Sequence, residues 1–236
     1  MGLHLTPEAR AAIDAADVLL YLSAEPLADR WVASLHRNAR SLVPLYRVGV
    51  EREEIYAAIV DAILEPVRSG ISVCAAFYGH PGVFVRPSHE AIRRARAEGY
   101  PARMLPAVSA EDCLFADLGV DPAEHGCASF DATAFLRRPR PLDTSACLVL
   151  WQVAAIGEGR AVAEGAHGRN LPILVERLLQ SYPPEHEVVL YEAAPYPVAE
   201  PAIERLSLSA LADAVPAPQA TLYVPPVGAA AGAPAR

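Results

Sequence analysis

The alternation of apolar runs with helical segments is the feature that most constrains the first half of this chain. A buried strand is predicted at 17–22, and the apolar run at 71–78 is typical of a strand buried on both faces of a parallel sheet. A further short strand is predicted at 102–105. Helices are predicted between and around these strands, at 7–16, 27–36, 52–68, 88–98 and 109–117. This order predicts a parallel, doubly wound α/β fold.

The second half of the chain has a different pattern. Its predicted strands are separated by long loops and lie at 127–130, 146–153, 187–192 and 220–224. Only two helices are predicted there, at 171–181 and 207–214. We therefore predict an α/β domain at 1–118, an α+β domain at 119–227 and a flexible, small-residue tail at 228–236.

Composition excludes several classes of function. The 236 residues carry a net charge of -8, which disfavours nucleic-acid phosphates as the main partner. All 20 basic residues are arginine. Without a lysine amine the chain can form neither a Schiff base nor a Walker-type phosphate loop.

Cysteine usage and hydropathy indicate a cytoplasmic protein. The four cysteines are widely spaced and contain no CxxC pair, so no metal site is predicted. The first ten residues lack the basic-then-apolar pattern of a signal peptide. No apolar stretch is long enough to span a membrane.

The strongest functional signal is the segment Phe77-Tyr-Gly-His-Pro-Gly-Val-Phe84, which begins as the predicted strand ends. Ligands of open α/β sheets bind beyond the carboxyl ends of strands. Two glycines let the backbone approach a ligand closely and offer its amides to a carboxylate. From spacing alone, a tight turn that only joins a strand to a helix is an equally good interpretation.

Several segments resemble the tetrapyrrole (corrin/porphyrin) methylase superfamily. YGHPGVF at 78–84 stands where those proteins carry a GDPxxxF-like loop. Leu5-Thr6 with AAIDAADV at 11–18 is similar to their opening segment, and LPAVSAED at 105–112 is similar to their PGxSS segment. Longer strings resemble the borosin α-N-methyltransferases, which methylate peptide-bond nitrogens of a ribosomally made precursor; these strings lie at 78–100, 102–122 and 148–157.

The resemblance implies a homodimer that binds S-adenosylmethionine between its two domains. It implies three groups of cofactor-binding residues: a first loop with Tyr78, Gly79, His80, Val83 and Phe84, a second segment with Ser109 and Ala110, and a third with Gln152 and Val153. Weaker matches add Ala193 and Thr221. Plain core packing is an equally good interpretation of Val83, Phe84 and Val153.

A second segment, Leu45-Tyr-Arg-Val-Gly-Val-Glu-Arg-Glu-Glu-Ile-Tyr56, resembles the borosin segment in which two tyrosines flank an arginine. By this resemblance Tyr46, Arg52 and Tyr56 are catalytic. Arg52 and Tyr56 are four residues apart on a predicted helix and so share a face. Without the resemblance, this pair would be interpreted as ordinary surface.

Amide chemistry explains why such residues would be needed. A peptide nitrogen is a weak nucleophile because its lone pair is delocalised into the carbonyl group. An arginine can stabilise the imidate oxygen that forms when the N–H proton leaves. A tyrosine phenolate, or a water held by a tyrosine, can accept that proton if the guanidinium lowers the pKa of the phenol.

The chain also departs from the family pattern. The family opens with an apolar strand and a Gly-rich turn, whereas this sequence starts at Met1-Gly-Leu-His, so we expect the first strand to be missing. A further tyrosine of the borosin set is replaced by Val43. The chain ends soon after Thr221, so the expected substrate is a separate precursor peptide.

Three other functions remain open. The chain could be a C-methyltransferase of a precorrin or another tetrapyrrole, which is the main alternative. A ribosomal-RNA ribose methyltransferase fits the acidic charge less well. A non-catalytic binding partner that has kept the fold is the alternative outside the enzymes.

Overall fold

The structure is a computed structural model that describes residues 4–23, 25–138, 140–160, 168–196 and 198–228. Residue contacts divide the chain into two compact units. The first comprises Met1–Ser109, Gly159–Ala161 and Pro195–Pro197; the second comprises Ala110–Glu158, Val162–Ala194 and Val198–Arg236. The main division therefore lies between 109 and 110, whereas the sequence predicted it near 118.

Helix α5 (Ala110–Leu118) explains this difference. The buried Tyr191 of the second unit donates a hydrogen bond of 2.6 Å to the Asp117 carboxylate, which attaches the helix to that unit. The sequence analysis had placed the boundary at the end of this helix rather than at its start.

The first unit is a parallel α/β structure, as predicted. Its strands β1 (Val18–Leu22), β2 (Ala39–Ser41) and β3 (Val73–Phe77) form a described sheet in the order β2-β1-β3, with both pairs parallel. Its helices are α1 (Pro7–Ala15), α2 (Pro26–Ser34), α3 (Arg52–Arg68) and α4 (Arg86–Ala97), with a 3-10 turn, η1, at Val43–Leu45.

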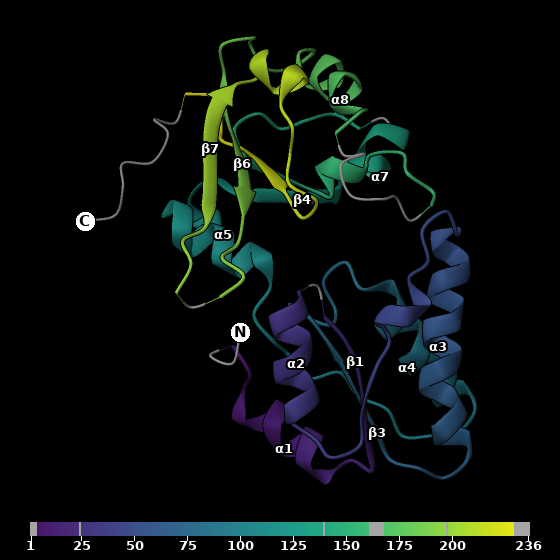
Figure 1. The fold of residues 1–236 in the computed structure, drawn as a ribbon. Coiled ribbons are helices and arrows are strands. Elements are labelled where there is room, and N and C mark those ends of the chain that lie inside the picture. The colour runs from purple at the N-terminus through teal and green to yellow at the C-terminus, as the bar shows by residue number, and fades with distance from the viewer. Residues whose placement is uncertain (1–3, 24, 139, 161–167, 197, 229–236) are drawn as a thin grey trace. The chain divides into compact units, whose positions relative to one another are not determined.

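Helices cover both faces of this sheet (Figure 1). Val18 and Leu20 of β1 pack against the apolar faces of α3 and α4, whereas the alternate residues Leu19 and Tyr21 pack against α1 and α2. All five residues of β1 are buried, but those of β3 are only partly buried because β3 lies at an edge of the described sheet. The carboxyl ends of β1 and β3 lie side by side, since Leu22 pairs with Phe77.

The predicted strand at 102–105 is wrong. The structure has irregular backbone there. Pro101 and Pro106 flank the segment and can donate no backbone hydrogen bond. The carbonyl group of Ala102 accepts a hydrogen bond of 2.9 Å from the Arg96 side chain instead of from a neighbouring strand.

The second unit contains a mixed sheet, in the order β4-β5-β8-β6-β7. Only β4 and β5 are parallel; the other pairs are antiparallel. The strands are β4 (Cys127–Asp131), β5 (Cys147–Trp151), β6 (Glu187–Glu192), β7 (Ala202–Ser207) and β8 (Thr221–Val224). Besides α5, the helices are α6 (Pro122–His125), α7 (Ala132–Arg137) and α8 (Leu171–Leu178), with 3-10 turns η2 (Val153–Ala155) and η3 (Ala210–Asp213).

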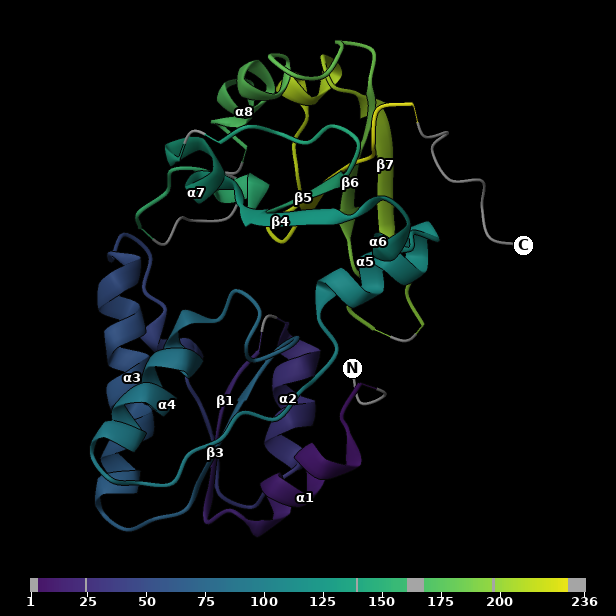
Figure 2. The same cartoon turned by 180° about the vertical axis from the view of Figure 1, so that it is seen from behind.

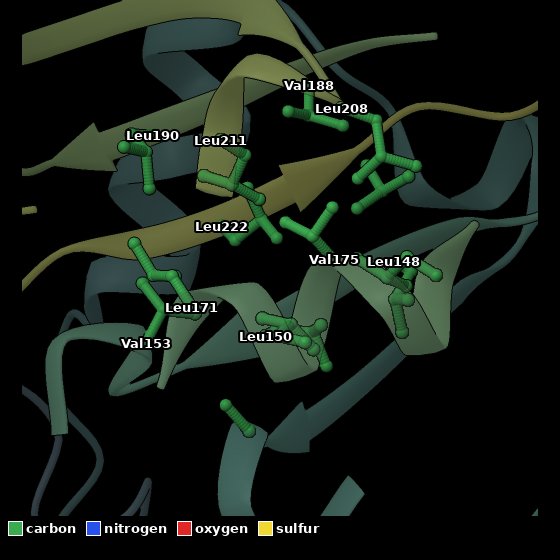
Figure 3. Close-up of a cluster of buried hydrophobic side chains, with 14 of the residues drawn as sticks. Leu148, Leu150, Val153, Leu171, Val175, Val188, Leu190, Leu208, Leu211 and Leu222 are labelled. Atoms are coloured by element: carbon green, nitrogen blue, oxygen red, sulfur yellow. The ribbon is translucent and has the colours of Figure 1, made fainter. Parts of the chain in front are cut away.

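The core of this unit lies between one face of the sheet and the α7, α8 and η3 elements. Figure 3 shows Leu148 and Leu150 of β5 and Leu222 of β8 directed toward Leu171 and Val175 of α8. The view from behind in Figure 2 shows α5 and α6 lying apart from α7 and α8. The α+β class of the second half is thus confirmed.

Two predictions for the second half need correction. The sequence analysis did not predict β7, and the helix predicted at 207–214 is only the short turn η3. The unpredicted strand pairs with β6 along its whole length and leaves several exposed residues, so it lacks the apolar signal of a buried strand. The predicted flexible tail lies outside the described residues except for Gly228.

Candidate active site

The loop at 78–85 begins where β3 ends, as the sequence analysis predicted. The Tyr78 amide donates a hydrogen bond of 3.2 Å to the carbonyl of Leu22, which ties the loop to the end of β1. Gly79 follows with a φ of +71°, a conformation that favours glycine. A Cβ atom at this position would meet no atom within 4 Å, so the backbone of Gly79 is open to a ligand.

Side chains hold the next part of the loop in one conformation. The Gly82 amide donates a hydrogen bond of 2.9 Å to Nδ1 of His80. The Gly82 carbonyl accepts one of 2.9 Å from Nε2 of His89 on α4. The Ser88 hydroxyl bonds to the carbonyl oxygens of Pro81 and Val85. Because both polar groups of the Gly82 peptide are bonded within the protein, the loop is preorganised for a ligand.

Phe84 and Gln152 are the described non-glycine residues that have a positive φ, of 56° and 57°. A bulky residue in the left-handed region is strained by about 1–3 kcal/mol, and such strain is concentrated at functional sites. The resemblance assigned cofactor contacts to both residues. Phe84 is also 43% exposed, so core packing does not explain its position.

Tyr46, Arg52 and Tyr56 lie close together in the first unit, and Tyr78 lies with them. Tyr46 is hydrogen-bonded to Tyr56, and its hydroxyl also interacts electrostatically with Tyr78 and Arg52. Tyr78 interacts in the same way with Tyr56 and Arg52. As whole residues, Tyr46 and Tyr78 are 41% and 55% exposed, so a ligand can reach them. The structure thus joins the candidate catalytic residues to the first residue of the candidate cofactor loop.

Desolvation has the largest effect on the pKa values of Tyr46 and Tyr78. It raises the pKa of Tyr46 above the ordinary value. The neighbouring Tyr56 and Tyr78 raise this pKa further, whereas Arg52 lowers it. Desolvation likewise raises the pKa of Tyr78, with Tyr56 adding to the rise and Arg52 opposing it. The condition for a phenolate base, a pKa below the ordinary value, is therefore not met at Tyr46. The guanidinium acts in the expected direction, but desolvation outweighs it.

A segment from far along the chain contacts the start of α3. The Arg52 amide is one of the donors that a helix leaves without an internal acceptor, and it donates a hydrogen bond of 2.9 Å to the carbonyl of Gly159. The next residue, Arg160, forms an antiparallel β-bridge with Glu51. Its Nε lies 2.6 Å from Oε1 of Glu51. Neither Gly159 nor Arg160 is predicted from the sequence, because no local pattern joins positions so far apart.

In the second unit, the strand register brings three candidate cofactor residues to one end of the sheet. Thr221, the first residue of β8, pairs with Tyr191 near the end of β6, and Leu222 pairs with Leu150 near the end of β5. Gln152 directly follows β5, and Ala193 directly follows β6. These two residues therefore lie at the same sheet end as Thr221.

The other candidate residues differ in accessibility. Ser109 and Thr221 are among the buried polar side chains, with 5% and 2% exposed. Ala110 is the first residue of α5. Val153 is completely buried in the core of the second unit, so any cofactor contact there would involve its backbone.

Metal sites and membrane-spanning helices are both absent from the described residues. In this part of the chain no cluster of three or more histidine, cysteine or acidic side chains could bind a metal ion, and the four cysteines are free. No described helix has the length and apolar character needed to cross a membrane.

The family model described as Tetrapyrrole (Corrin/Porphyrin) Methylases matches residues 3–212, which is most of the chain. The chain belongs to the tetrapyrrole methylase family. This confirms the family that the loop at 78–84 and the segment at 105–112 had indicated. In this tetrapyrrole methylase the loop at 78–85 lies within the residues that the family model matches.

The names of curated relatives of this tetrapyrrole methylase combine a methyltransferase with a cyclic peptide precursor. A methyltransferase/ribosomally synthesized cyclic peptide gymnopeptides precursor from Gymnopus fusipes is 39% identical over 227 residues, which is 94% of this chain and 54% of that protein. A methyltransferase/ribosomally synthesized type I borosin cyclic peptide precursor from Coprinopsis marcescibilis is 41% identical, over 94% of this chain and 59% of that protein. The chain thus spans between half and three fifths of these two relatives.

Solved structures of the family support the fold. A uroporphyrin-III-C-methyltransferase from Thermus thermophilus has a TM-score of 0.61 and 24% identity, covering 95% of this chain and 89% of that one. A complex of uroporphyrin-III C-methyl transferase from the same organism with S-adenosyl homocysteine has a TM-score of 0.59 and 22% identity, covering 93% and 90%. At these identities the likeness concerns the fold of the tetrapyrrole methylase alone.

Proposed function

We propose that the chain is an S-adenosylmethionine-dependent methyltransferase that methylates backbone amide nitrogens of a peptide. The observation that carries this proposal is the grouping of Tyr46, Tyr56 and Tyr78 with Arg52 at the start of the candidate cofactor loop. The names of relatives that are 39% and 41% identical support it, since they combine a methyltransferase with a peptide precursor.

The residues present fit S-adenosylmethionine. Gly79 offers an open backbone surface, and Tyr78 and Phe84 offer accessible rings beside it. Gln152 and Thr221 add polar groups at one end of the second sheet. When bound, the cofactor would supply an electrophilic methyl group on a positively charged sulfur. We assign the loop at 78–84 to binding and orienting the cofactor.

Arg52 would make the peptide nitrogen reactive. When the amide loses its N–H proton, negative charge develops on the carbonyl oxygen, and a fixed guanidinium stabilises that charge. The nitrogen–hydrogen bond would break and its proton would pass to a base. The nitrogen would form its new bond to the methyl carbon while the carbon–sulfur bond breaks, and the electron pair of that bond would go to the sulfur. Orientation of the amide by the surrounding rings would supply further rate.

The tyrosines would have separate roles. Because its pKa is raised, Tyr46 keeps its proton near neutral pH and can act as a hydrogen-bond donor. We therefore propose that Tyr46 is not the base that accepts the amide proton. Tyr56 is hydrogen-bonded to Tyr46 and shares a helix face with Arg52. It would accept the proton as a phenolate, or it would hold a water molecule that accepts the proton.

We further propose that the peptide is a separate molecule. Apart from Thr221, all candidate catalytic and cofactor residues lie within residues 3–212, which the family model matches. A peptide added from solution therefore needs only to reach this site. The main alternative remains C-methylation of a tetrapyrrole. It is less favoured because the solved porphyrin methyltransferase is only 24% identical, against 39% and 41% for the peptide relatives.

The function can be tested with the full chain, S-adenosylmethionine and a synthetic peptide encoded by a short neighbouring reading frame with an apolar C-terminus. We expect mass increments of whole methyl groups, and fragment ions should locate them on backbone nitrogens. The matched assay replaces the peptide with uroporphyrinogen III. Methylation of the tetrapyrrole, or of peptide side chains alone, would contradict the proposed function.

We also propose that the chain forms a homodimer. Support comes from the resemblance and from α5, where Cys113 and Phe115 are only partly buried within their own unit. Sedimentation equilibrium at micromolar concentration should therefore give about twice the monomer mass of 25.2 kDa. A single species at the monomer mass over this concentration range would refute the dimer.

A further inference from the structure

Three carboxylates lie next to Arg52 in the sequence. Glu51 precedes it as the N-cap of α3, and Glu53 and Glu54 follow it in the first turn. Acidic residues at a helix N-terminus stabilise the helix, because the helix dipole is positive there. The same carboxylates would oppose the proposed chemistry, since a negative charge near the amide disfavours a developing imidate oxygen.

A different arginine engages each of these carboxylates. Glu53 is paired with Arg86 of α4, and Glu54 lies 4.0 Å from Arg47. Glu51 has the best-defined partner: Nε of Arg160 lies 2.6 Å from its Oε1. The three arginines come from three separate segments of the chain.

In the Glu51–Arg160 ion pair, unlike the other two ion pairs, backbone contacts also join the two segments. Arg160 belongs to the β-bridge with Glu51, and the neighbouring Gly159 carbonyl accepts the Arg52 amide hydrogen. A Cβ atom at Gly159 would lie only 3.3 Å from Oε2 of Glu51, so this segment packs closely against the carboxylate. The backbone of residues 159–160 therefore holds the Arg160 guanidinium at Glu51 through contacts other than the ion pair itself.

We propose that Arg160 is a positioning residue for the methylation, because it neutralises Glu51 and so keeps the field at Arg52 positive. This inference rests on the proposed function. Arg160 touches neither the peptide nor the cofactor in this role. It acts through the charge of Glu51, which is one residue away from the guanidinium that stabilises the imidate oxygen.

The test compares four variants in the peptide assay. Arg160→Gln leaves the negative charge of Glu51 without its positive partner. We expect kcat to fall about three- to fivefold, the size typical of an interaction between solvent-exposed charges. The KM for the peptide and the Kd for S-adenosylmethionine should stay unchanged. Glu51→Gln removes the charge and should keep the wild-type kcat. The double variant Glu51→Gln/Arg160→Gln should recover kcat to within about twofold, because no charge is left uncompensated.

The fourth variant, Arg68→Gln, is a matched control at the other end of the same helix. Arg68 lies 2.6 Å from Glu98, the same distance as in the Glu51–Arg160 pair. Its loss should leave kcat unchanged. If Glu51→Gln slows the reaction as much as Arg160→Gln, or if the double variant stays slow, Arg160 is only a structural tether and the inference is wrong.

The assay separates this inference from the proposed function. If the wild-type chain adds no backbone methyl groups, the proposed function fails and the inference fails with it. If the wild-type chain methylates the peptide and Arg160→Gln retains its kcat, only the role of Arg160 is refuted. The thermal unfolding of each variant should also be measured, because loss of folded protein would lower the apparent kcat.

Discussion

Arg52→Ala should lower the rate of peptide methylation by about 10²–10³-fold, the usual loss when one preorganised oxyanion donor is removed. The reason is that Arg52 lies with three tyrosines beside the candidate cofactor loop and carries the charge that would stabilise the imidate oxygen. Calorimetric titration should give a Kd for S-adenosylmethionine near the wild-type value. Single-turnover assays with mass spectrometry measure the rate.

Two further variants sharpen this test. Arg52→Lys should restore little activity, because a point charge on a flexible stem does not reproduce the planar guanidinium. Tyr56→Phe should also slow the reaction if Tyr56 holds or accepts the proton. Methylation by Arg52→Ala at the wild-type rate would rule out the imidate mechanism and would favour the tetrapyrrole alternative.

Gly79→Val should abolish measurable binding of S-adenosylmethionine. Gly79 has a φ of +71°, and a side chain there would point into open space against which no protein atom lies within 4 Å. In the proposed complex that space belongs to the cofactor. Valine would both occupy it and be strained by about 1–3 kcal/mol, so calorimetry should be accompanied by a measurement of unfolding.

Gly70 provides the matched control for backbone strain. It lies just after α3 with a φ of +79°, and a Cβ atom there also meets nothing within 4 Å. Gly70→Val should lose a similar amount of stability but keep the cofactor affinity. Gly79→Ala, a milder change at the tested position, should weaken binding without loss of the fold. An unchanged Kd for a folded Gly79→Val would show that the cofactor does not approach this loop.

The local pattern of apolar residues was enough to predict the helices and strands in which that pattern is regular. The apolar runs that became β1 and β3, the helix α3 and the strand β6 were all recognised because their apolar residues recur with the period of a buried strand or helix. Strand β7 was missed and the strand at 102–105 was wrongly predicted for one shared reason. Whether a short segment becomes a strand depends on a pairing partner, and a partner is a property of the tertiary structure.

For the candidate site, too, some features followed from the sequence and others only from the tertiary structure. The sequence alone indicated the family, the candidate loop at 78–84 and the candidate Tyr46–Arg52–Tyr56 set, because each depends on residues that lie close together in the sequence. The tertiary structure alone decided three things. It brought Tyr78 to the tyrosine cluster, it aligned Gln152, Ala193 and Thr221 at one sheet end, and it paired Arg160 with Glu51.

The acidity of Tyr46 was also decided by the tertiary structure. The sequence correctly indicated a guanidinium near the phenol, and this neighbour acts to lower the pKa of Tyr46. The net shift is upward, because desolvation sums over every atom packed around the hydroxyl, whereas the attraction to Arg52 involves one neighbour. Sequence proximity identifies the neighbour, but only the folded chain determines how much water is removed.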